Sequence, residues 1–253
     1  MALEHVLLLL VAAAAAGWVD AVVGGGGLLQ LPALLVSGVP TVEAMATNKL
    51  SSVFGTTSAA VAYARSTKVD RQVAIPGAAL AVLSAGLGAW AAASISAEVL
   101  RPAVMVVLLA VAAFVTLRPN MGAVPAPHLR TGPRVFTAVA VAGVVISFYD
   151  GIMGPGTGTF LIIAFTTILG LDFVSASASA KIINVGTNVG ALLVLGSQGY
   201  VNWALGLAMA VCNVAGAQFG ARTAIRRGTG FVRIVLLVVV VAMVIRLGWQ
   251  QFG

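Results

Sequence analysis

Long apolar runs separated by short polar connections fill almost the whole chain. Their approximate positions are 3–23, 28–38, 43–64, 73–93, 99–117, 135–153, 157–170, 173–196, 203–222 and 231–248. Most of them have about 20 residues, the length at which an α-helix crosses the hydrocarbon core of a bilayer. Helices are the expected form, because lipid offers no hydrogen-bond partner for an open strand edge. The pattern therefore predicts an all-α polytopic membrane protein.

Two of the runs, 28–38 and 157–170, are too short to cross about 30 Å alone at about 1.5 Å per residue. Each directly follows a glycine-rich break, Gly24 to Gly27 in the first case and Gly154-Pro155-Gly156-Thr157-Gly158 in the second. Consecutive glycines do not hold a rigid helix, since each costs about 1 kcal/mol relative to alanine. We therefore expect about eight full spans plus two short broken half-helices.

Composition agrees with a membrane protein, because 60% of the residues are apolar, 8% are charged and the mean hydropathy is +1.07. A soluble domain carries about 25% charged residues, so a soluble enzyme and a disordered chain are both excluded. The single cysteine, Cys212, cannot form an intramolecular disulfide or a cysteine-based metal cluster. Because no Ser-His-Asp set, paired-carboxylate site or metal motif is recognisable, we predict neither an enzyme nor a cofactor.

Basic residues cluster in three loops. These are Arg65, Lys68 and Arg71; Arg118, Arg130 and Arg134; and Arg222, Arg226, Arg227 and Arg233. The net charge of +7 could indicate nucleic-acid binding, but charges scattered between apolar runs are better explained by topology. Under the positive-inside rule all three loops are cytoplasmic. Each short segment then counts as a crossing, and both termini lie outside. In the alternative, the short segments are re-entrant beside eight true spans, which places the third basic loop outside.

The chain divides into two similar halves, 1–118 and 135–253, joined by a proline-rich linker at 119–134. Asp20 matches Asp150 at a spacing of 130 residues, and Lys49 matches Lys181 at 132. The recurrence in register of an intramembrane aspartate and an intramembrane lysine is not expected by chance. Five segments per half is an odd number, so the second half is inserted upside down relative to the first. We therefore predict two inverted-topology repeats, an architecture of transporters. The other matching positions are Gly24 and Gly154, Gly26 and Gly156, Ala85-Gly86 and Ala215-Gly216, and Arg101 and Arg233.

The paired Asp-x-x-x-Gly-x-Gly breaks and the lysine segments that follow them, with Ala-Thr-Asn-Lys-Leu at 46–50, resemble a known family. It is the TauE/SafE-type sulfite exporter family, also called the 4-toluene sulfonate uptake permeases. The resemblance extends from about Gly17 to Arg246. It implies a multi-pass protein of a prokaryotic plasma (inner) membrane that moves small anions, typically sulfur oxyanions or organosulfonates. It does not identify the substrate.

The glycine breaks and the lysine segments supply the candidate binding site. A half-helix begins at each break, and its free N–H groups with their partial positive charge suit an anion. Lys49 and Lys181 lie roughly 10 to 12 Å into their segments. A charge there costs at least about 2.5 kcal/mol and needs a reason. We predict that the substrate contacts Gly24, Gly25, Gly26, Asn48, Lys49, Ser52, Gly154, Gly156, Thr157, Lys181, Asn184 and Asn188.

Structural alternatives exist for each group of candidate residues. The glycines could serve close helix packing, the lysines could extend to the interface, and the amides and hydroxyls could join helices. Glycine pairs with small-xxx-small spacing, Gly186 with Gly190 and Gly216 with Gly220, are better explained by packing. Asp20 and Asp150 do not help to bind an anion. Either they form ion pairs with the two lysines, or their reversible protonation couples transport to a proton gradient.

The sequence as a whole predicts a secondary transporter that works by alternating access, because no nucleotide-binding motif is present for ATP-driven transport. Its expected partners are a small inorganic or organosulfur anion, the lipid bilayer and a coupling ion such as the proton, but no nucleic acid. A passive anion channel remains an alternative, and an integral-membrane enzyme a weaker one. Neither the direction of transport nor the oligomeric state follows from the sequence.

Overall fold

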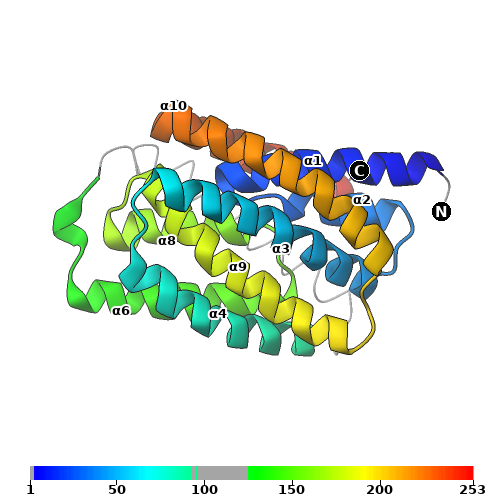
Figure 1. Cartoon of the computed structure of the whole chain (residues 1–253), viewed down its shortest axis with the longest axis horizontal. Helices are drawn as coiled ribbons and strands as arrows, with labels where there is room; N and C mark the ends of the chain where they lie inside the picture. The colour runs from blue at the N-terminus through cyan, green and yellow to red at the C-terminus, as the bar shows by residue number, and fades with distance from the viewer. Residues whose placement is uncertain (1–2, 93–94, 96–124, 253) are drawn as a thin grey trace.

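The computed structural model describes residues 3–92, 95 and 125–252, and every regular element within them is helical (Figure 1). Arg101, Arg118, the predicted segment 99–117 and residues 119–124 of the predicted linker lie outside the described residues. The elements are α1 (Leu3–Val23), α2 (Gly27–Val36), α3 (Thr41–Ser66), α4 (Arg71–Ala92), η1 (Pro127–Leu129), α6 (Gly132–Ala140), η2 (Val141–Ile146), α7 (Ser147–Ile152), α8 (Thr157–Leu169), α9 (Phe173–Ser197) and α10 (Trp203–Phe252).

Most of the helices have the length and hydropathy of membrane spans. Among the described residues, five stretches are long and apolar enough: Glu4–Val23, Arg71–Ala92, Gly132–Ile152, Phe173–Ser197 and Trp203–Val232. Helix α3 has 26 residues but is more polar. Helices α2 and α8, with 10 and 13 residues, match the two short segments predicted from the sequence. The described part of the chain is thus an all-α membrane protein with two half-length helices.

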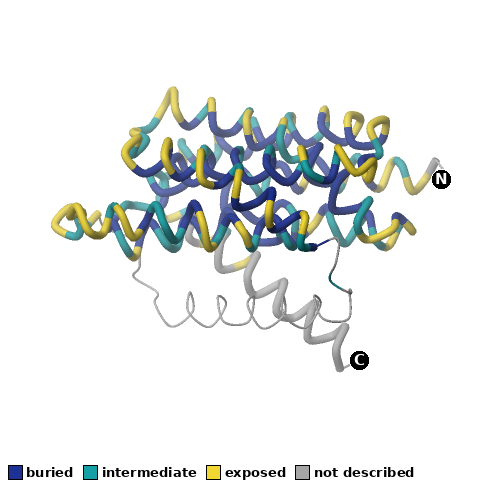
Figure 2. The backbone as a smooth tube through the Cα atoms, turned by 90° about the horizontal axis from the view of Figure 1, so that it is seen from below, coloured by how far each residue is buried: buried dark blue, intermediate teal, exposed yellow. Residues whose placement is uncertain are grey.

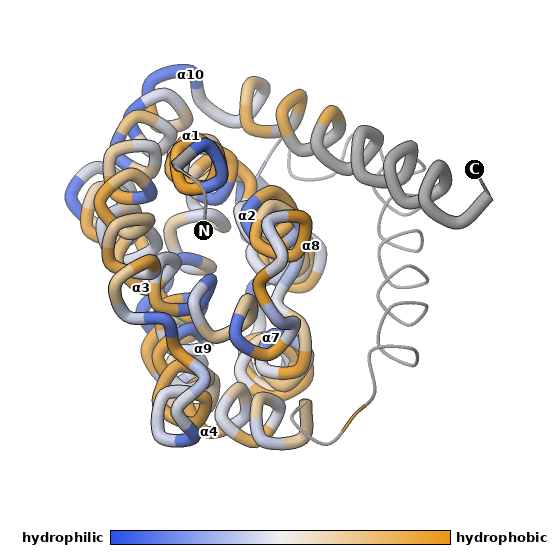
Figure 3. The backbone as a smooth tube through the Cα atoms, turned by 90° about the vertical axis from the view of Figure 1, so that its right-hand side faces the viewer, coloured by the Kyte–Doolittle hydropathy of each residue, from blue (hydrophilic) through white to orange (hydrophobic). Residues whose placement is uncertain are grey.

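The long helices pack as two adjoining rows. Seen end-on, α10, α3, α9 and α4 follow one another in the first row, and α1, α2, α8 and α7 lie beside it (Figure 3). At the two outer edges α1 packs along α10, and α7 packs along α4. Residues that face the space between helices are buried, whereas the outer faces are exposed (Figure 2). The core of the bundle therefore lies between the two rows.

The three groups of basic residues lie at one end of the bundle, at the left in Figure 1, which we call the basic end. The loop before α4 is joined to the segment before α6 by the ion pair of Asp70 with Arg130, 2.8 Å long. The start of α9 lies at the same end, because Ser179 accepts a hydrogen bond from the Asp70 backbone. Helix α10 returns there and breaks at Gly228 (φ 71°), between the two predicted segments 203–222 and 231–248. The sequence prediction that the basic loops share one side is confirmed for the described residues.

The short helices turn back instead of continuing the crossing that precedes them. Gly170, just after α8, accepts a hydrogen bond from the backbone of Ala126, just before α6, so α6 to α8 begin and end at the basic end. In the same way Leu34 of α2 packs against Leu9 of α1 at the opposite end. Whether each short segment counts as a full crossing stays a prediction. Each long arm and its short helix form a hairpin that returns to the end where it began, which agrees with basic loops on one side.

Glycines allow the edge helices to approach closely. A Cβ atom at Gly216 would lie 1.9 Å from the carbonyl oxygen of Ala14, and one at Gly190 would lie 2.1 Å from that of Val82. No side chain fits at such positions without moving a helix backbone. The predicted packing role of the small-xxx-small pairs is therefore confirmed. Such contacts suit membrane helices, whose association relies on close van der Waals packing.

The described part of the predicted linker differs slightly from the expectation. Residues 125–131 contain only the short η1, but α6 begins at Gly132 and includes Pro133. Proline is tolerated in the first turn of a helix, because the N–H group it lacks would have no partner there. The side chain of Arg130 binds both Asp70 and Gln72, and Asp70 raises the pKa of its guanidinium. This exposed clamp fixes the linker to the α3–α4 loop.

Candidate functional site

A small cavity lies between the two hairpins and the polar faces of α3 and α9. Its volume is about 20 Å³, which leaves room for about one water molecule. The lining contains three of the four intramembrane charges, together with amides, hydroxyls and glycines from both halves of the chain. The lining residues are Asp20, Gly24, Gly27, Asn48, Lys49, Ser52, Thr56, Asp150, Gly154, Thr157, Gly158, Asn184 and Asn188.

The cavity owes its position to backbone reversals at the two glycine breaks. Gly24 has φ of 77° and Gly154 has φ of 86°, in the left-handed region that residues with a Cβ rarely adopt. The two breaks also touch, because a Cβ atom at Gly24 would lie 2.3 Å from the Cα atom of Gly158. Glycine is therefore required both for the turn and for the close approach of the hairpins.

Lys49 and Asp150 form a buried ion pair across the two halves. The Lys49 ammonium lies 2.5 Å from Oδ2 of Asp150, and both side chains are only 2% exposed. The other oxygen of the carboxylate accepts a hydrogen bond of 2.6 Å from the Thr157 hydroxyl. The carboxylate of Asp150 is thus held on both oxygens, by α3 and by the start of α8.

Lys181 and Asp20 form the second pair, 3.0 Å long, with the side chains 1% and 14% exposed. Lys181 also donates a hydrogen bond to the backbone carbonyl of Asp20. Thr56 donates its hydroxyl to Oδ2 of Asp20 at 3.2 Å. Each pair therefore joins an aspartate of one half to the lysine of the other, and neither lysine extends to the surface.

The two pairs lie at different depths. Lys49 is eight residues into α3 and Lys181 eight residues into α9 (49 − 41 and 181 − 173), about 12 Å along each helix. Because α3 begins at the end opposite the basic end and α9 begins at the basic end, the pairs approach the middle from opposite sides. Each hairpin thus reaches past the middle of the bundle to meet the lysine of the other half.

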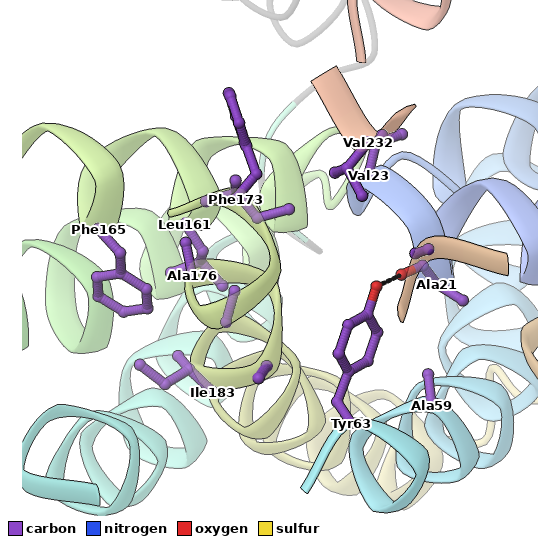
Figure 4. Close-up of a cluster of buried hydrophobic side chains, with 14 of the residues drawn as sticks. Ala21, Val23, Ala59, Tyr63, Leu161, Phe165, Phe173, Ala176, Ile183 and Val232 are labelled. Carbon is purple, nitrogen blue, oxygen red and sulfur yellow. Dashed lines mark hydrogen bonds between the residues drawn. The ribbon is translucent and has the colours of Figure 1, made fainter. Parts of the chain in front are cut away.

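The first break is fixed by three donors from other helices. The carbonyl of Asp20 accepts from Lys181 of α9, that of Ala21 from Tyr63 of α3 at 3.0 Å (Figure 4), and that of Val23 from Thr159 of α8 at 2.7 Å. The carbonyl of Asp20 also accepts from the Gly24 N–H group. Those of Ala21 and Val23 lie in the last turn of the helix, where carbonyls have no intrahelical partner, so Tyr63 and Thr159 supply one.

The second break is fixed mostly from within its own hairpin. Tyr149 donates its hydroxyl to the carbonyl of Pro155 at 2.8 Å, and Thr157 donates to that of Gly154 at 2.9 Å. A stretch of π-helix, η2, precedes this break, whereas α1 is regular up to Val23. From another helix, Lys49 of α3 contacts this hairpin through its ion pair with Asp150. The two breaks are therefore similar in backbone but different in support.

Both short helices direct their first residues at the cavity. Helix α2 begins at Gly27 and α8 at Thr157, and both residues are part of the lining. Their N-cap residues, Gly26 and Gly156, make no side-chain capping hydrogen bond. The partial positive charge of two helix N-termini therefore adds to the Lys49 ammonium, an arrangement that can hold an anion.

Most of the predicted binding residues meet in this one cavity, but four do not line it. Gly25 is buried in the turn between α1 and α2, and Gly156 forms the left-handed turn before α8 with φ of 83°. A Cβ atom at Gly26 would lie 2.6 Å from the carbonyl oxygen of Ala16, so Gly26 serves packing. Lys181 binds Asp20, which lines the cavity, but is not itself part of the lining.

Three lining residues were missed in the sequence analysis: Gly27, Thr56 and Gly158. Thr56 continues the spacing of four residues from Asn48 through Ser52, which places all three on one face of α3. Extending that period by one turn would have identified it. The two glycines belong to the glycine-rich motifs already recognised. Within the described residues, no group of three or more His, Cys, Asp or Glu could hold a metal ion.

Comparison with known proteins gives consistent matches over nearly the whole chain. Residues 9–247 match the family described as Sulfite exporter TauE/SafE. "Probable membrane transporter protein ORF9" of Sinorhizobium sp is 39% identical over 229 residues, which cover 90% of this chain and 87% of that protein. "Probable membrane transporter protein YfcA" of Escherichia coli K12 is 31% identical over 235 residues, covering 93% and 86%. No solved structure matches the chain significantly.

Proposed function

Because this chain belongs to the sulfite exporter TauE/SafE family, we propose that it is a secondary transporter of small anions, namely sulfur oxyanions or organosulfonates such as sulfite, thiosulfate or a sulfonate. Its relatives are bacterial proteins named as probable membrane transporters, and its own helices suit a multi-pass membrane protein of a prokaryote. With the basic end in the cytoplasm, the chain follows the positive-inside rule.

The observation that carries the proposal is the composition of the cavity. A lysine ammonium, two helix N-termini and the side chains of Asn48, Ser52, Asn184 and Asn188 surround it, beside the carboxylates of Asp20 and Asp150. These groups offer positive charge and neutral donors for the oxygens of a small anion. At about 20 Å³ the cavity is smaller than an oxyanion of four or five heavy atoms. The substrate therefore enters only when the hairpins or the ion pairs move, as in a carrier.

We further propose that the halves are inverted-topology repeats that exchange inward-open and outward-open shapes. The packing supports this, because α1 packs on α10 as α7 packs on α4, and α3 packs on α10 as α9 packs on α4. Equivalent glycines make equivalent contacts. A Cβ atom at Gly88 would lie 2.2 Å from the carbonyl oxygen of Phe148, and one at Gly220 would lie 2.5 Å from that of Trp18.

Uptake by purified protein in liposomes tests the proposal. Labelled sulfite, thiosulfate, sulfate and taurine are compared with and without a pH gradient, and the transported anion is then tested for counterflow. We expect at least one sulfur anion to move and to show counterflow, since alternating access exchanges labelled for unlabelled substrate. Failure of every sulfur anion to move or compete contradicts the substrate class. Flux without counterflow indicates a passive channel instead.

A further inference from the structure

The two buried ion pairs differ in what their lysines face. Lys49 lines the cavity, and its only described hydrogen bond goes to the Asp150 carboxylate. Lys181 does not line the cavity and binds the backbone carbonyl of Asp20 as well as its carboxylate. If the carboxylate of Asp20 moved away, Lys181 would still hold the end of α1. If that of Asp150 moved away, the Lys49 ammonium would be free inside the cavity.

The cavity already contains a ligand-binding group without a partner. The side chain of Asn48 is more than nine-tenths buried, and its carbonyl oxygen has no hydrogen-bond partner among the described residues. Its neighbour in sequence is Lys49. A buried polar atom in this state costs about 1 to 3 kcal/mol, unless a water or a ligand occupies the space beside it. Because a carbonyl oxygen only accepts hydrogen bonds, the partner that fits beside it is a donor, such as a water molecule or a protonated oxygen of the substrate.

Charge balance limits how an anion can enter. The four buried charges, two lysines and two aspartates, sum to zero. An added monoanion would leave an unpaired negative charge in a buried site, which costs several kcal/mol. A proton that binds one of the carboxylates removes this cost. Entry of a monoanion then requires one proton.

The surroundings of Asp150 determine which carboxylate accepts that proton. Its hairpin packs against α4, α8, α9 and η2. Of these elements, α4 carries only Arg71, at its first residue, α9 carries only Lys181, and α8 and η2 carry no charged group. Tyr149 directs its hydroxyl at Pro155. Apart from Asp20 across the cavity, Lys49 is therefore the charged group that faces Asp150.

We propose that the transported anion, as a monoanion such as hydrogen sulfite or a sulfonate, replaces Asp150 on Lys49 while one proton binds the Asp150 carboxylate, and that Lys181 with Asp20 is a structural support for the end of α1. This rests on the proposed function and defines the coupling within it. The Lys49–Asp150 contact breaks, a Lys49–anion contact forms, and the neutral carboxyl keeps its hydrogen bond to Thr157. The total charge of the site is zero before and after.

Matched aspartate variants in liposomes test this inference. Two fluxes are measured, namely exchange of the labelled anion at equal pH and uptake driven by a pH gradient. We expect the ratio of driven uptake to exchange in Asp150→Asn to fall to its value without a gradient, and Asp150→Glu to keep the response. Asp20→Asn should melt at a lower temperature but still respond to the gradient. Loss of the response in Asp20→Asn, or its persistence in Asp150→Asn, overturns the inference. Absence of all exchange in the wild type overturns the proposed function and the inference with it.

A second pair of variants preserves every charge and serves if the aspartate variants do not fold. Thr157→Val removes the hydroxyl bound to Asp150, and Thr56→Val removes the one bound to Asp20. The Thr157 hydroxyl contacts the carboxylate that leaves Lys49, whereas the Thr56 hydroxyl contacts the carboxylate that stays in place. We expect Thr157→Val to shift the pH of half-maximal flux and Thr56→Val to leave it unchanged. Equal shifts in both variants, or a shift in Thr56→Val alone, contradict the assignment.

Discussion

The contact of α7 with α4 gives a prediction that connects packing to the ion pair. Gly151 follows Asp150 in α7, and a Cβ atom there would lie 2.1 Å from the carbonyl oxygen of Ala85. An ordinary van der Waals contact begins at 3.4 Å, so Gly151→Ala forces the two helices apart by about 1.3 Å (3.4 − 2.1). Overpacking of this kind costs about 1 to 3 kcal/mol.

We expect the variant to lose both stability and transport. At about 2 to 4 °C per kcal/mol for a chain of this size, the melting temperature in detergent falls by about 2 to 12 °C. If α7 moves directly away from α3, the 2.5 Å contact of Lys49 with Asp150 lengthens to about 3.8 Å (2.5 + 1.3), beyond the range of a hydrogen bond. The rate of substrate exchange should then fall as well.

Gly132→Ala is the matched control, because a Cβ atom at Gly132 would meet no atom within 4 Å. The control should melt and transport like the wild type. Melting is followed by the fluorescence of a thiol-reactive dye or by light scattering, and exchange is measured with the labelled anion in liposomes. If Gly151→Ala is as stable and as active as Gly132→Ala, the reasoning from helix separation is refuted.

Two further predictions concern buried polar groups. Lys49→Met leaves the Asp150 carboxylate buried without its partner and should cost about 3 to 5 kcal/mol, whereas Lys49→Met with Asp150→Asn should recover most of the loss; a double variant that melts no higher than Lys49→Met contradicts this. Tyr63→Phe removes the hydroxyl bound to the carbonyl of Ala21 and should cost about 1 to 3 kcal/mol in thermal unfolding, with no change in the pH dependence of flux. A Tyr63→Phe protein that melts like the wild type would show that this carbonyl finds another partner.

The half-helices could be predicted from sequence because glycine marks their limits. The predicted segments 28–38 and 157–170 correspond to Gly27–Val36 and Thr157–Leu169. Each begins where a left-handed residue or a close backbone approach excludes a side chain. Because this cause is local, the limits of the short helices can be recognised in the sequence without knowledge of the fold.

The pairing of charges could not be predicted, because it depends on how the halves meet. Asp20 and Lys49 recur as Asp150 and Lys181, and the spacing is the same whether each aspartate binds the lysine of its own half or of the other. Only the reach of each hairpin past the middle selects the second arrangement. The choice between a crossing and a re-entrant segment was left open for the same reason, because the length of a segment of 10 or 13 residues does not show the direction in which it runs.

The unequal support of the two breaks was also beyond the sequence. Tyr63 and Thr159 lie 42 and 136 residues from the carbonyls they bind. The π-helical stretch at Val141–Ile146 corresponds by repeat spacing to a regular part of α1, although both segments are apolar. Differences of this kind arise from contacts between elements and leave no local pattern.

The exchange of ion-pair partners also has a consequence for how the protein is made. The first half leaves the ribosome with Asp20 and Lys49. Their partners are synthesised later, Asp150 101 residues after Lys49 and Lys181 161 residues after Asp20. Until the second half is inserted, an unpaired aspartate and an unpaired lysine must stay hydrated or remain at the mouth of the translocon. The first half is therefore not a finished membrane domain. Its last folding step must wait for the helices that carry the opposite charges.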